Sequence, residues 1–406
     1  FNEQDEARFI VDRLQDWVNK GNKREDAAVL YRSNAQSREL EDALLRVGMP
    51  YRIYGGHRFY ERLEIKNALA YLRLLVNRQD DTAMERVINV PTRGIGGRTI
   101  DQIRALAREE NCSLWMACAK CVNEKLLSAR AANAVLGFLE MIDAMQEACA
   151  DLELHRKVEY VIKHSGLIQH HEKEGGEKAR ARLENLDELI TAANSFDESE
   201  LDADDDLSSY AILSAFLDQA ALDAGDAQAA DNEDAVQLMT LHSAKGLEFP
   251  LVFMAGMEEG LFPHRMSMEN ISGLEEERRL CYVGITRAMA KLYLCYAESR
   301  RLHGDVSLTR PSRFIREIPR ELIEEIRLKS TVSKPAFGAG GKSFGDSGAE
   351  VPQTELSLGQ RVVHGKFGEG VILNYEGQGQ NARVQVNFDG FGSKWLVLSY
   401  AKLEAV

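Results

Sequence analysis

The sequence predicts an α/β protein: a parallel-sheet domain interrupted by a large helical insertion, then a flexible linker and a small all-β barrel. Two apolar runs typical of buried parallel strands lie far apart, at 27–31 (AAVLY) and 236–241 (VQLMTL). Between them apolar residues recur at helical spacing, and near the C-terminal end short strands alternate with glycine turns. An α/β domain whose two pieces meet in space around an insertion accounts for this order.

Residues 1–61 form the first piece of the predicted sheet domain. Apolar residues recur at helical spacing over 9–17, so a helix begins almost at the first residue. The strand at 27–31 leads into a second helix, for which Gly48 is the expected stop, and a strand follows at 51–54. Because this pattern is under way so early in the chain, we expect the sequence to be a piece of a longer protein.

Residues 62–232 form the predicted helical insertion. Ile65 and Val76 mark one amphipathic helix, and Val135 and Ile142 mark another. The end of this segment is strongly acidic, and a mobile loop is expected there.

Residues 233–329 form the second piece of the sheet domain. Strands are expected at 236–241, 251–254 and 291–296, and a helix rich in charge begins near Leu274.

The remaining chain is predicted to be a linker and a barrel. Residues 330–355 are rich in Gly and Ser with little apolar pattern, which is typical of a flexible linker. Short strands separated by glycine turns over 356–406 predict an SH3-like or Tudor-like barrel. Four aromatic residues are expected to build mainly its core, with a binding face as the alternative: Phe367, Tyr375, Phe388 and Trp395.

The charge distribution leaves the choice of partner open. The formal net charge is -14, but residues 196–234 contain about thirteen acidic side chains and no Lys or Arg, so the rest is nearly balanced. Local basic surfaces, and with them a nucleic-acid partner, therefore remain compatible with the composition. No apolar run approaches the ~18 residues that span a bilayer, and no signal-peptide pattern is present, so we expect a cytoplasmic protein.

The six cysteines do not suggest a disulfide scaffold in a chain of this length. Cys118 and Cys121 form a C-x-x-C spacing near Cys112, but no second pair follows. Because structural zinc sites usually need four clustered ligands, we predict buried thiols here and no metal site.

The segment TLHSAKGLEF (240–249) follows a predicted strand directly. A strand end that breaks into small and polar residues can present hydroxyls, an imidazole and backbone amides to phosphates. An ordinary surface loop is the alternative interpretation of this segment taken alone.

A second segment, EEERRLCYVGITRA (275–288), places Arg287 within an otherwise apolar stretch. An unpaired guanidinium there would be costly, so an anionic partner is expected. The alternative is an ion pair with Glu275 or Glu277.

One segment, AFGAGGKS (336–343), matches the phosphate-loop pattern but lacks the structural context of a phosphate loop. A phosphate loop joins a buried strand to a helix whose N-terminus faces the phosphates. Neither is predicted here, because TVSKP precedes the match and FGDSGAEVPQT follows it. We assign the segment to the linker.

Together the two polar segments resemble motifs V and VI of the UvrD/Rep/PcrA helicases of superfamily 1. LYRSNAQSR (30–38) and YRIYGGHRFYERLEIKNAL (51–69) resemble the segments that precede that family's helical insertion. TRGIGGRT (92–99) resembles the duplex-contacting loop of the insertion. The resemblance runs from residue 1 to about 328, and the Tudor-like tail is similar to that of the UvrD and PcrA branch.

The resemblance implies that the sheet domain is the second of two RecA-like domains, with ATP bound between them. The first domain, which is not in this sequence, would supply the phosphate loop and the Mg²⁺ ligands. By resemblance Arg287 is the catalytic arginine that reaches the γ-phosphate, a role that can be worth ~10³ to 10⁵ in rate. Gly246 and Glu248 resemble ATP-binding residues, with the carboxylate accepting a hydrogen bond from the ribose.

The same resemblance implies the DNA contacts. Residues at two strand ends are similar to family residues that touch single-stranded DNA: Arg32, Asn34, Thr240, His242 and Ser243. The glycine-rich turn of the insertion would approach a duplex phosphate through four residues: Thr92, Gly94, Ile95 and Gly96. Hydroxyl and amide contacts to phosphate carry no sequence information, which suits a motor that moves along any sequence.

The implied function is an ATP-driven DNA helicase and translocase of 3′ to 5′ polarity, acting at junctions of single- and double-stranded DNA. Roles in nucleotide-excision repair, mismatch repair and replication follow by resemblance, with repair proteins as partners and the nucleoid as the location. The Tudor-like tail would dock a protein, and RNA polymerase is the family's candidate. This sequence alone is expected to be inactive.

Two alternatives of other classes remain. The chain could be a non-catalytic module that binds DNA or protein through its barrel and helical insertion. It could instead belong to a helicase–nuclease, which predicts a clustered Asp, Glu and Lys metal site downstream.

Overall fold

The structure is a computed structural model that describes residues 2–196, 209–225, 233–302 and 305–326, together with five strands further on. The chain divides into two compact units, Phe1–Glu325 and Ile326–Val406. The predicted linker at 330–355, including the phosphate-loop-like segment 336–343, lies outside the described residues.

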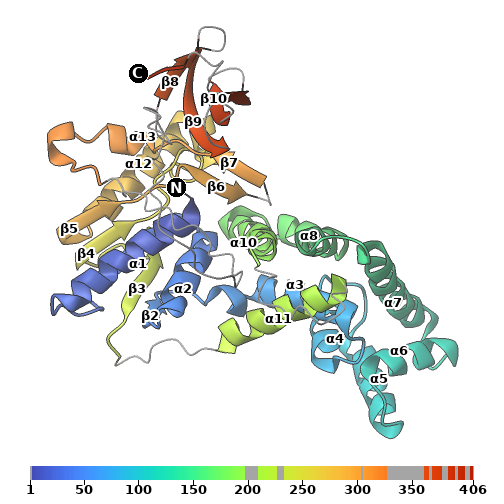
Figure 1. Ribbon diagram of the computed structural model, residues 1–406. Helices are drawn as coiled ribbons and strands as arrows, with labels where there is room; N and C mark the ends of the chain where they lie inside the picture. Colours follow the sequence, from blue (N-terminus) through green and yellow to red (C-terminus); the bar gives the residue numbers. More distant parts are fainter. Residues whose placement is uncertain are drawn as a thin grey trace, which may run out of the picture. The chain divides into compact units, whose positions relative to one another are not determined.

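The first unit contains the predicted parallel sheet, with five strands in the order β2-β3-β1-β4-β5 (Figure 1). The strands are β1 (Ala27–Tyr31), β2 (Tyr51–Ile53), β3 (Val236–Thr240), β4 (Phe249–Met254) and β5 (Ala288–Leu294). The central strand β1 pairs in parallel with both β3 and β4, which follow it by about 200 residues. The interrupted α/β fold is therefore confirmed.

Alternate side chains of β1 serve two cores, as the pleat of a strand requires. On one face Val29 and Tyr31 pack with α1 (Glu3–Asn19) and α2 (Ser37–Arg46). On the other face Ala28 and Leu30 belong to the core that holds Leu280 and Cys281 of α12. Helix α12 spans Ile271–Ile285. Helices thus cover both faces of the sheet, which explains the continuous apolar runs of its strands.

Helix α12 lies unusually close to the sheet at Gly284. A Cβ added there would meet Leu241 Cδ2 at 2.6 Å and Met254 Cε at 2.8 Å. A side chain at this position would force the ends of the Leu241 and Met254 side chains to shift.

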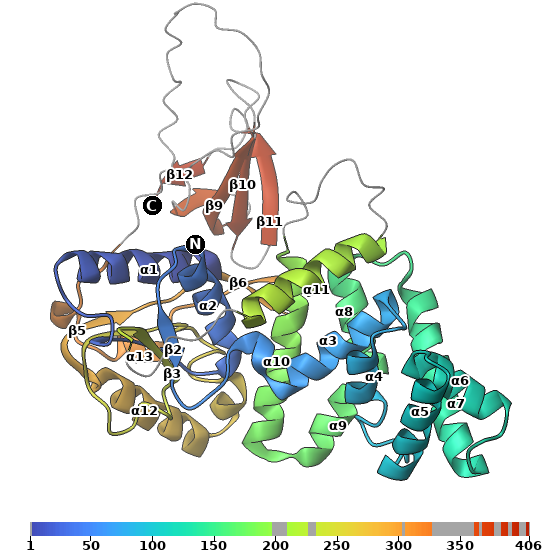
Figure 2. The same cartoon turned by 90° about the horizontal axis from the view of Figure 1, so that it is seen from below.

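The helical insertion lies beside the sheet in the same unit (Figure 2). Its helices share one apolar core, as the helical spacing predicted. Cys118 and Cys121 are buried in that core, as predicted, whereas Cys112 is half-buried. The helices are α3 (Leu63–Val76), α4 (Asp81–Val87), α5 (Gly97–Glu109), α6 (Leu114–Asn123), α7 (Ala129–Cys149), α8 (Leu154–His164), α9 (Leu167–Glu174), α10 (Gly176–Asn194) and α11 (Ser209–Gly225).

Shorter elements connect these parts. A two-stranded hairpin that the sequence did not predict follows β5. The short elements are η1 (Asn34–Gln36), η2 (Phe59–Glu61), η4 (Arg265–Glu269), β6 (Ser299–Leu302), β7 (Asp305–Leu308), α13 (Arg313–Arg316) and η5 (Arg320–Leu322). Over the part of the chain that is described, no helix is both long and apolar enough to cross a membrane.

The second unit contains a five-stranded antiparallel sheet in the order β11-β10-β9-β8-β12. Buried aliphatic side chains of Val362, Ile372, Val384 and Val386 lie at its centre. The aromatic side chains predicted for this core lie outside the described side chains. The strands are β8 (Arg361–His364), β9 (Gly368–Glu376), β10 (Arg383–Phe388), β11 (Gly392–Val397) and β12 (Leu403–Ala405).

Candidate functional site

The structure brings the five predicted strand-end residues to one edge of the sheet. Arg32 and Asn34 follow β1, and Thr240 is the last residue of β3, followed by His242 and Ser243. Because β1 and β3 pair in parallel with their last residues side by side, both carboxyl ends open at the same edge. Such an edge is where open α/β sheets bind ligands.

The β3 end turns sharply and presents its polar groups. The hydroxyls of Thr240 and Ser243 lie 3.0 Å apart, and the Ser243 amide donates to Thr240 Oγ1 at 3.2 Å. Loss of water around the ring, followed by the positive charge of Arg32, lowers the pKa of His242 below its ordinary value. Its side chain is nevertheless exposed, and the imidazole is mostly neutral at pH 7.

Arg32 is held by a carboxylate that the sequence analysis did not predict as its partner. Its Nε donates to both carboxylate oxygens of Glu277 at 3.0 Å, and its Nη2 donates to Oε1 at 2.7 Å. Glu277 also accepts hydrogen bonds from the His264 amide at 3.1 Å and the Ser267 hydroxyl at 3.3 Å. The Glu277 side chain is only 4% exposed, so this pair joins the sheet edge to the interior of α12.

Arg287 lies at the opposite edge of the sheet, just before β5. Its guanidinium donates to the carbonyl of Leu247 at 2.8 Å, the carbonyl of Val283 at 2.8 Å and the Thr286 hydroxyl at 2.9 Å. Its own carbonyl accepts from the Phe249 amide at 2.9 Å. The two polar segments of the sequence therefore meet directly through Arg287 and Leu247.

The alternative ion pair of Arg287 with a nearby glutamate is wrong. Glu275 instead pairs with Arg278, and Glu277 pairs with Arg32. Among the residues that the structure describes, no carboxylate lies within ion-pair distance of the half-buried Arg287 guanidinium. Its hydrogen bonds go to neutral oxygens, so its positive charge remains available to an anion.

The remaining predicted nucleotide-binding residues flank the Leu247 carbonyl. Gly246 adopts a φ of +85°, a left-handed conformation that favours glycine, and Glu248 is exposed. Residues 246–248 and Arg287 therefore form one cluster at the amino ends of β4 and β5. The two predicted sets of sheet residues lie at opposite edges of the same sheet.

The glycine-rich turn lies apart from both clusters, between α4 and α5 in the helical insertion (Figure 1). Ile95 is buried and its amide donates to Asn89 Oδ1 at 3.3 Å, which fixes the turn from inside. Thr92, Gly94 and Gly96 are exposed. Gly94 has a φ of +81°, and nothing lies within 4 Å of a Cβ added at either glycine, so the backbone is open to a ligand.

Helix α10 of the insertion also reaches the carboxyl edge, which the sequence did not indicate. Glu184 accepts a short hydrogen bond from the Ser33 hydroxyl and lies 3.2 Å from His264 Nε2. Burial alone would raise the pKa of Glu184, but hydrogen bonds from His264 and Ser33 hold it below its ordinary value.

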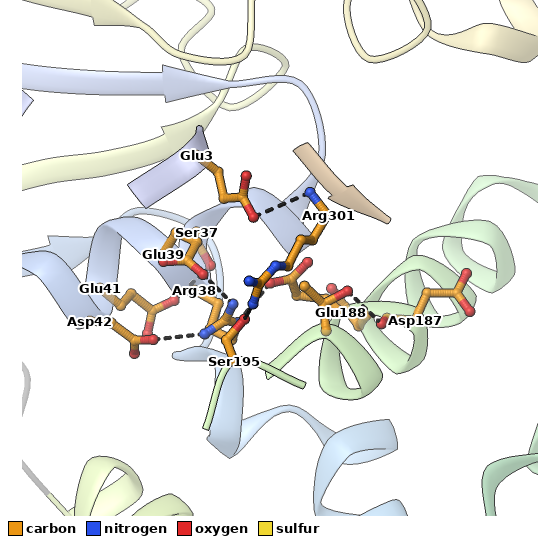
Figure 3. A network of polar contacts seen from close by, with 12 residues as sticks. Glu3, Ser37, Arg38, Glu39, Glu41, Asp42, Asp187, Glu188, Ser195 and Arg301 are labelled. Carbon is orange, nitrogen blue, oxygen red and sulfur yellow. Dashed lines mark hydrogen bonds and ion pairs between the residues drawn. The ribbon is translucent and has the colours of Figure 1, made fainter. Parts of the chain in front are cut away.

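A second polar network fastens α10 to α2 around Arg38 (Figure 3). The Arg38 guanidinium donates to Glu188 at 2.6 Å, to Asp42 at 2.8 Å and to Glu39 in a short contact. Burial raises the pKa of Glu188 to about 7 and that of Asp42 to about 6, although Arg38 opposes both shifts. Three carboxylates therefore share one buried cation.

One group of side chains in the described ranges has donor atoms close enough together to hold a metal ion. His170, His171 and Glu174 of α9 offer ligand atoms within 4.8 Å of one another. Arg182 already forms a short ion pair with the carboxylate of Glu174. A bound cation would have to compete with that guanidinium.

Comparison with known proteins decides the family. The family model described as the UvrD-like helicase C-terminal domain matches residues 1–299, and the PcrA/UvrD tudor domain matches 358–404. The chain belongs to the UvrD-like helicases. The match covers both edges of the sheet and the helical insertion.

Individual UvrD-like relatives agree along the whole chain. DNA helicase II of Escherichia coli (strain K12) is 55% identical over 408 residues, covering 100% of this chain and 55% of the relative. DNA helicase II of Haemophilus influenzae is 52% identical over 406 residues. The ATP-dependent DNA helicase PcrA of Staphylococcus aureus (strain Mu50) is 36% identical over 413 residues, covering 99% of this chain. The chain thus spans about half the length of these UvrD-like relatives.

Proposed function

We propose that this chain is part of an ATP-dependent DNA helicase and translocase, and that it supplies one wall of the ATP site. The observation that carries the proposal is Arg287, whose half-buried charge has neutral hydrogen-bond partners and no carboxylate among the described residues. Its location beside residues 246–248 supports a nucleotide there, with Arg287 stabilising charge on the γ-phosphate. Glu248 would accept a hydrogen bond from the ribose.

The opposite edge of the sheet would carry single-stranded DNA. Arg32, Asn34, Thr240, His242 and Ser243 offer a guanidinium, an amide, hydroxyls and a neutral imidazole, which suit contacts to the strand's phosphates. The exposed turn at Thr92, Gly94, Ile95 and Gly96 would approach the backbone of the duplex ahead of the strand. Neither set selects a base sequence, as a translocating motor requires.

ATP would bind as its Mg²⁺ complex, with the metal ligands and the phosphate loop on a part of the protein outside this chain. In that case the chain alone does not hydrolyse ATP. We extend the proposal to 3′ to 5′ movement in excision and mismatch repair and in replication. The tudor domain would dock a protein such as RNA polymerase.

The test replaces Arg287 by Ala in the complete protein that contains this chain. We expect the DNA-stimulated ATPase rate to fall by about 10³-fold or more while ATP binding is largely kept. Arg279→Ala is the matched control, because Arg279 belongs to the same sequence segment but is exposed and pairs with Glu276. Equal rates for Arg287→Ala and the wild type would refute the assigned role.

A further inference from the structure

We propose that Glu277 is a positioning residue that couples the DNA edge of the sheet to the ATP edge by tying Arg32 to helix α12. This inference rests on the proposed function and adds a residue to it. Glu277 would touch neither DNA nor ATP itself.

The contact between Arg32 and Glu277 fixes the end of β1 relative to helix α12. The two nitrogens of Arg32 and the two oxygens of Glu277 form a fork, with distances of 2.7 to 3.0 Å. Such a bidentate pair fixes orientation as well as distance. The Arg32 side chain is 17% exposed, so part of it remains accessible to solvent while Glu277 holds the guanidinium.

Glu277 is itself fixed by further donors. The amide of His264 and the hydroxyl of Ser267 both donate to it, and both belong to the segment that enters α12. Burial alone would raise the pKa of Glu277, but the Arg32 guanidinium together with the hydrogen bonds from His264 and Ser267 holds it below its ordinary value. A phosphate that draws Arg32 outward would therefore pull on a charged carboxylate that accepts five hydrogen bonds.

Helix α12 runs from this contact towards the other edge of the sheet. Arg287 lies ten residues after Glu277, about 15 Å along at 1.5 Å per residue, just beyond the helix end at Ile285. Gly284 lies directly against the side-chain ends of Leu241 and Met254, so no side chain of α12 stands between helix and sheet at this point. A displacement of α12 at Glu277 is therefore carried to the Arg287 guanidinium and its bond to the Leu247 carbonyl.

This geometry predicts that Glu277→Gln in the complete protein lowers the DNA-stimulated ATPase rate without weakening DNA binding. The substitution keeps the side-chain size but removes the charge, so the ion pair that fixes Arg32 is lost while Arg32 itself stays available to phosphate. We expect the dissociation constant for a dT oligonucleotide to stay the same or become tighter. At saturating oligonucleotide we expect the ATPase rate to fall by at least about fivefold, in the range of measured couplings between sites. The rate without DNA should remain within about twofold of the wild type, less than the change typical of coupled sites, because no phosphate then acts on Arg32.

The matched control is Glu276→Gln, one residue earlier on the same helix. Glu276 is 72% exposed and pairs only with Arg279 among the described residues, so its variant should behave as the wild type in all three measurements. Equal DNA stimulation for both variants would overturn the inference. Loss of the DNA-free and DNA-stimulated rates by the same factor would also overturn it, because that result indicates general damage to the fold.

Two further results keep the test decisive. If Glu277→Gln does not fold, Glu277→Asp keeps the charge but shortens the reach to Arg32, and it should lose stimulation while remaining folded; full stimulation would overturn the inference. Arg32→Gln combined with Glu277→Gln should lose no more stimulation than Arg32→Gln alone, whereas additive losses would contradict a shared contact. A wild-type protein without any DNA-stimulated ATPase would instead refute the proposed function.

Discussion

Replacing Arg38 by Met tests the idea that one buried cation holds the helical insertion on the sheet domain. Arg38 of α2 is 5% exposed and contacts Glu188 of α10 at 2.6 Å and Asp42 at 2.8 Å, with Glu39 as a third partner (Figure 3). Methionine fills a similar volume but leaves three acidic groups without their shared cation. Removing one partner of a buried ion pair costs about 3–5 kcal/mol, because the remaining charge stays buried and unpaired.

The assay is thermal unfolding of the chain followed by circular dichroism at pH 7.5. With roughly 2 °C of Tm per kcal/mol for a unit of this size, we expect Arg38→Met to lower Tm by about 6–10 °C. Arg46→Met is the matched control, since Arg46 is exposed on the same helix, and we expect a change within about 1 °C there. The double variant Arg38→Met/Glu188→Leu should recover part of the loss, because it removes a carboxylate that Arg38→Met leaves buried.

If Arg38→Met melts within about 1 °C of Arg46→Met, the buried cation does not hold the insertion, because protonation or water then relieves the three carboxylates at no cost. A double variant less stable than Arg38→Met would contradict the same idea. That result would mean that the Glu188 carboxylate stabilises the fold even without Arg38.

Two more measurements follow from the structure. Burial raises the pKa of Glu188 from 4.5 to about 7, so its contribution to stability is complete below pH 4.5 and is lost as the pH rises through 7. Glu188→Gln should therefore reduce the loss of unfolding free energy between pH 5 and pH 8 by as much as about 3 kcal/mol, seen as a shallower fall of Tm; an unchanged slope would show that Glu188 is not the titrating group. Gly284→Ala should melt at a lower temperature than Gly137→Ala on α7, because its Cβ would displace the side-chain ends of Leu241 and Met254, whereas Gly137 has open space around it. Equal Tm values for these two alanine variants would contradict the close packing of α12.

The strands of the sheet domain were predictable because parallel strands buried on both faces have an unmistakable composition. The predicted and observed bounds agree for β1, and β3 differs by one residue at its end. Strands β4 and β5 begin earlier than predicted because Phe249 and Arg287 extend the pairing through a backbone hydrogen bond. The hairpin of β6 and β7 was missed because its sequence, SRRL and DVSL, has too few apolar residues to show a strand pattern.

The ion-pair partners could not be predicted, because they depend on which surfaces the fold brings together. In the sequence, the run Glu275-Glu276-Glu277 is typical of a solvated face, yet its members point in different directions around α12, about 100° apart. Glu276 is exposed, whereas Glu277 is buried against Arg32, which is 245 residues away in the chain. Only the packing of α12 on the sheet decides between these environments.

The position of β1 at the centre of the sheet also constrains the order in which the chain folds during synthesis. Both neighbours of β1 are translated about 200 residues later, so at roughly 5–20 residues per second the apolar strand waits about 10–40 seconds for a partner. The helical insertion, which has a core of its own, emerges in that interval and can fold first. The nascent chain therefore carries an unpaired, aggregation-prone strand beside a folded domain, and holdase chaperones would find their binding site at AAVLY.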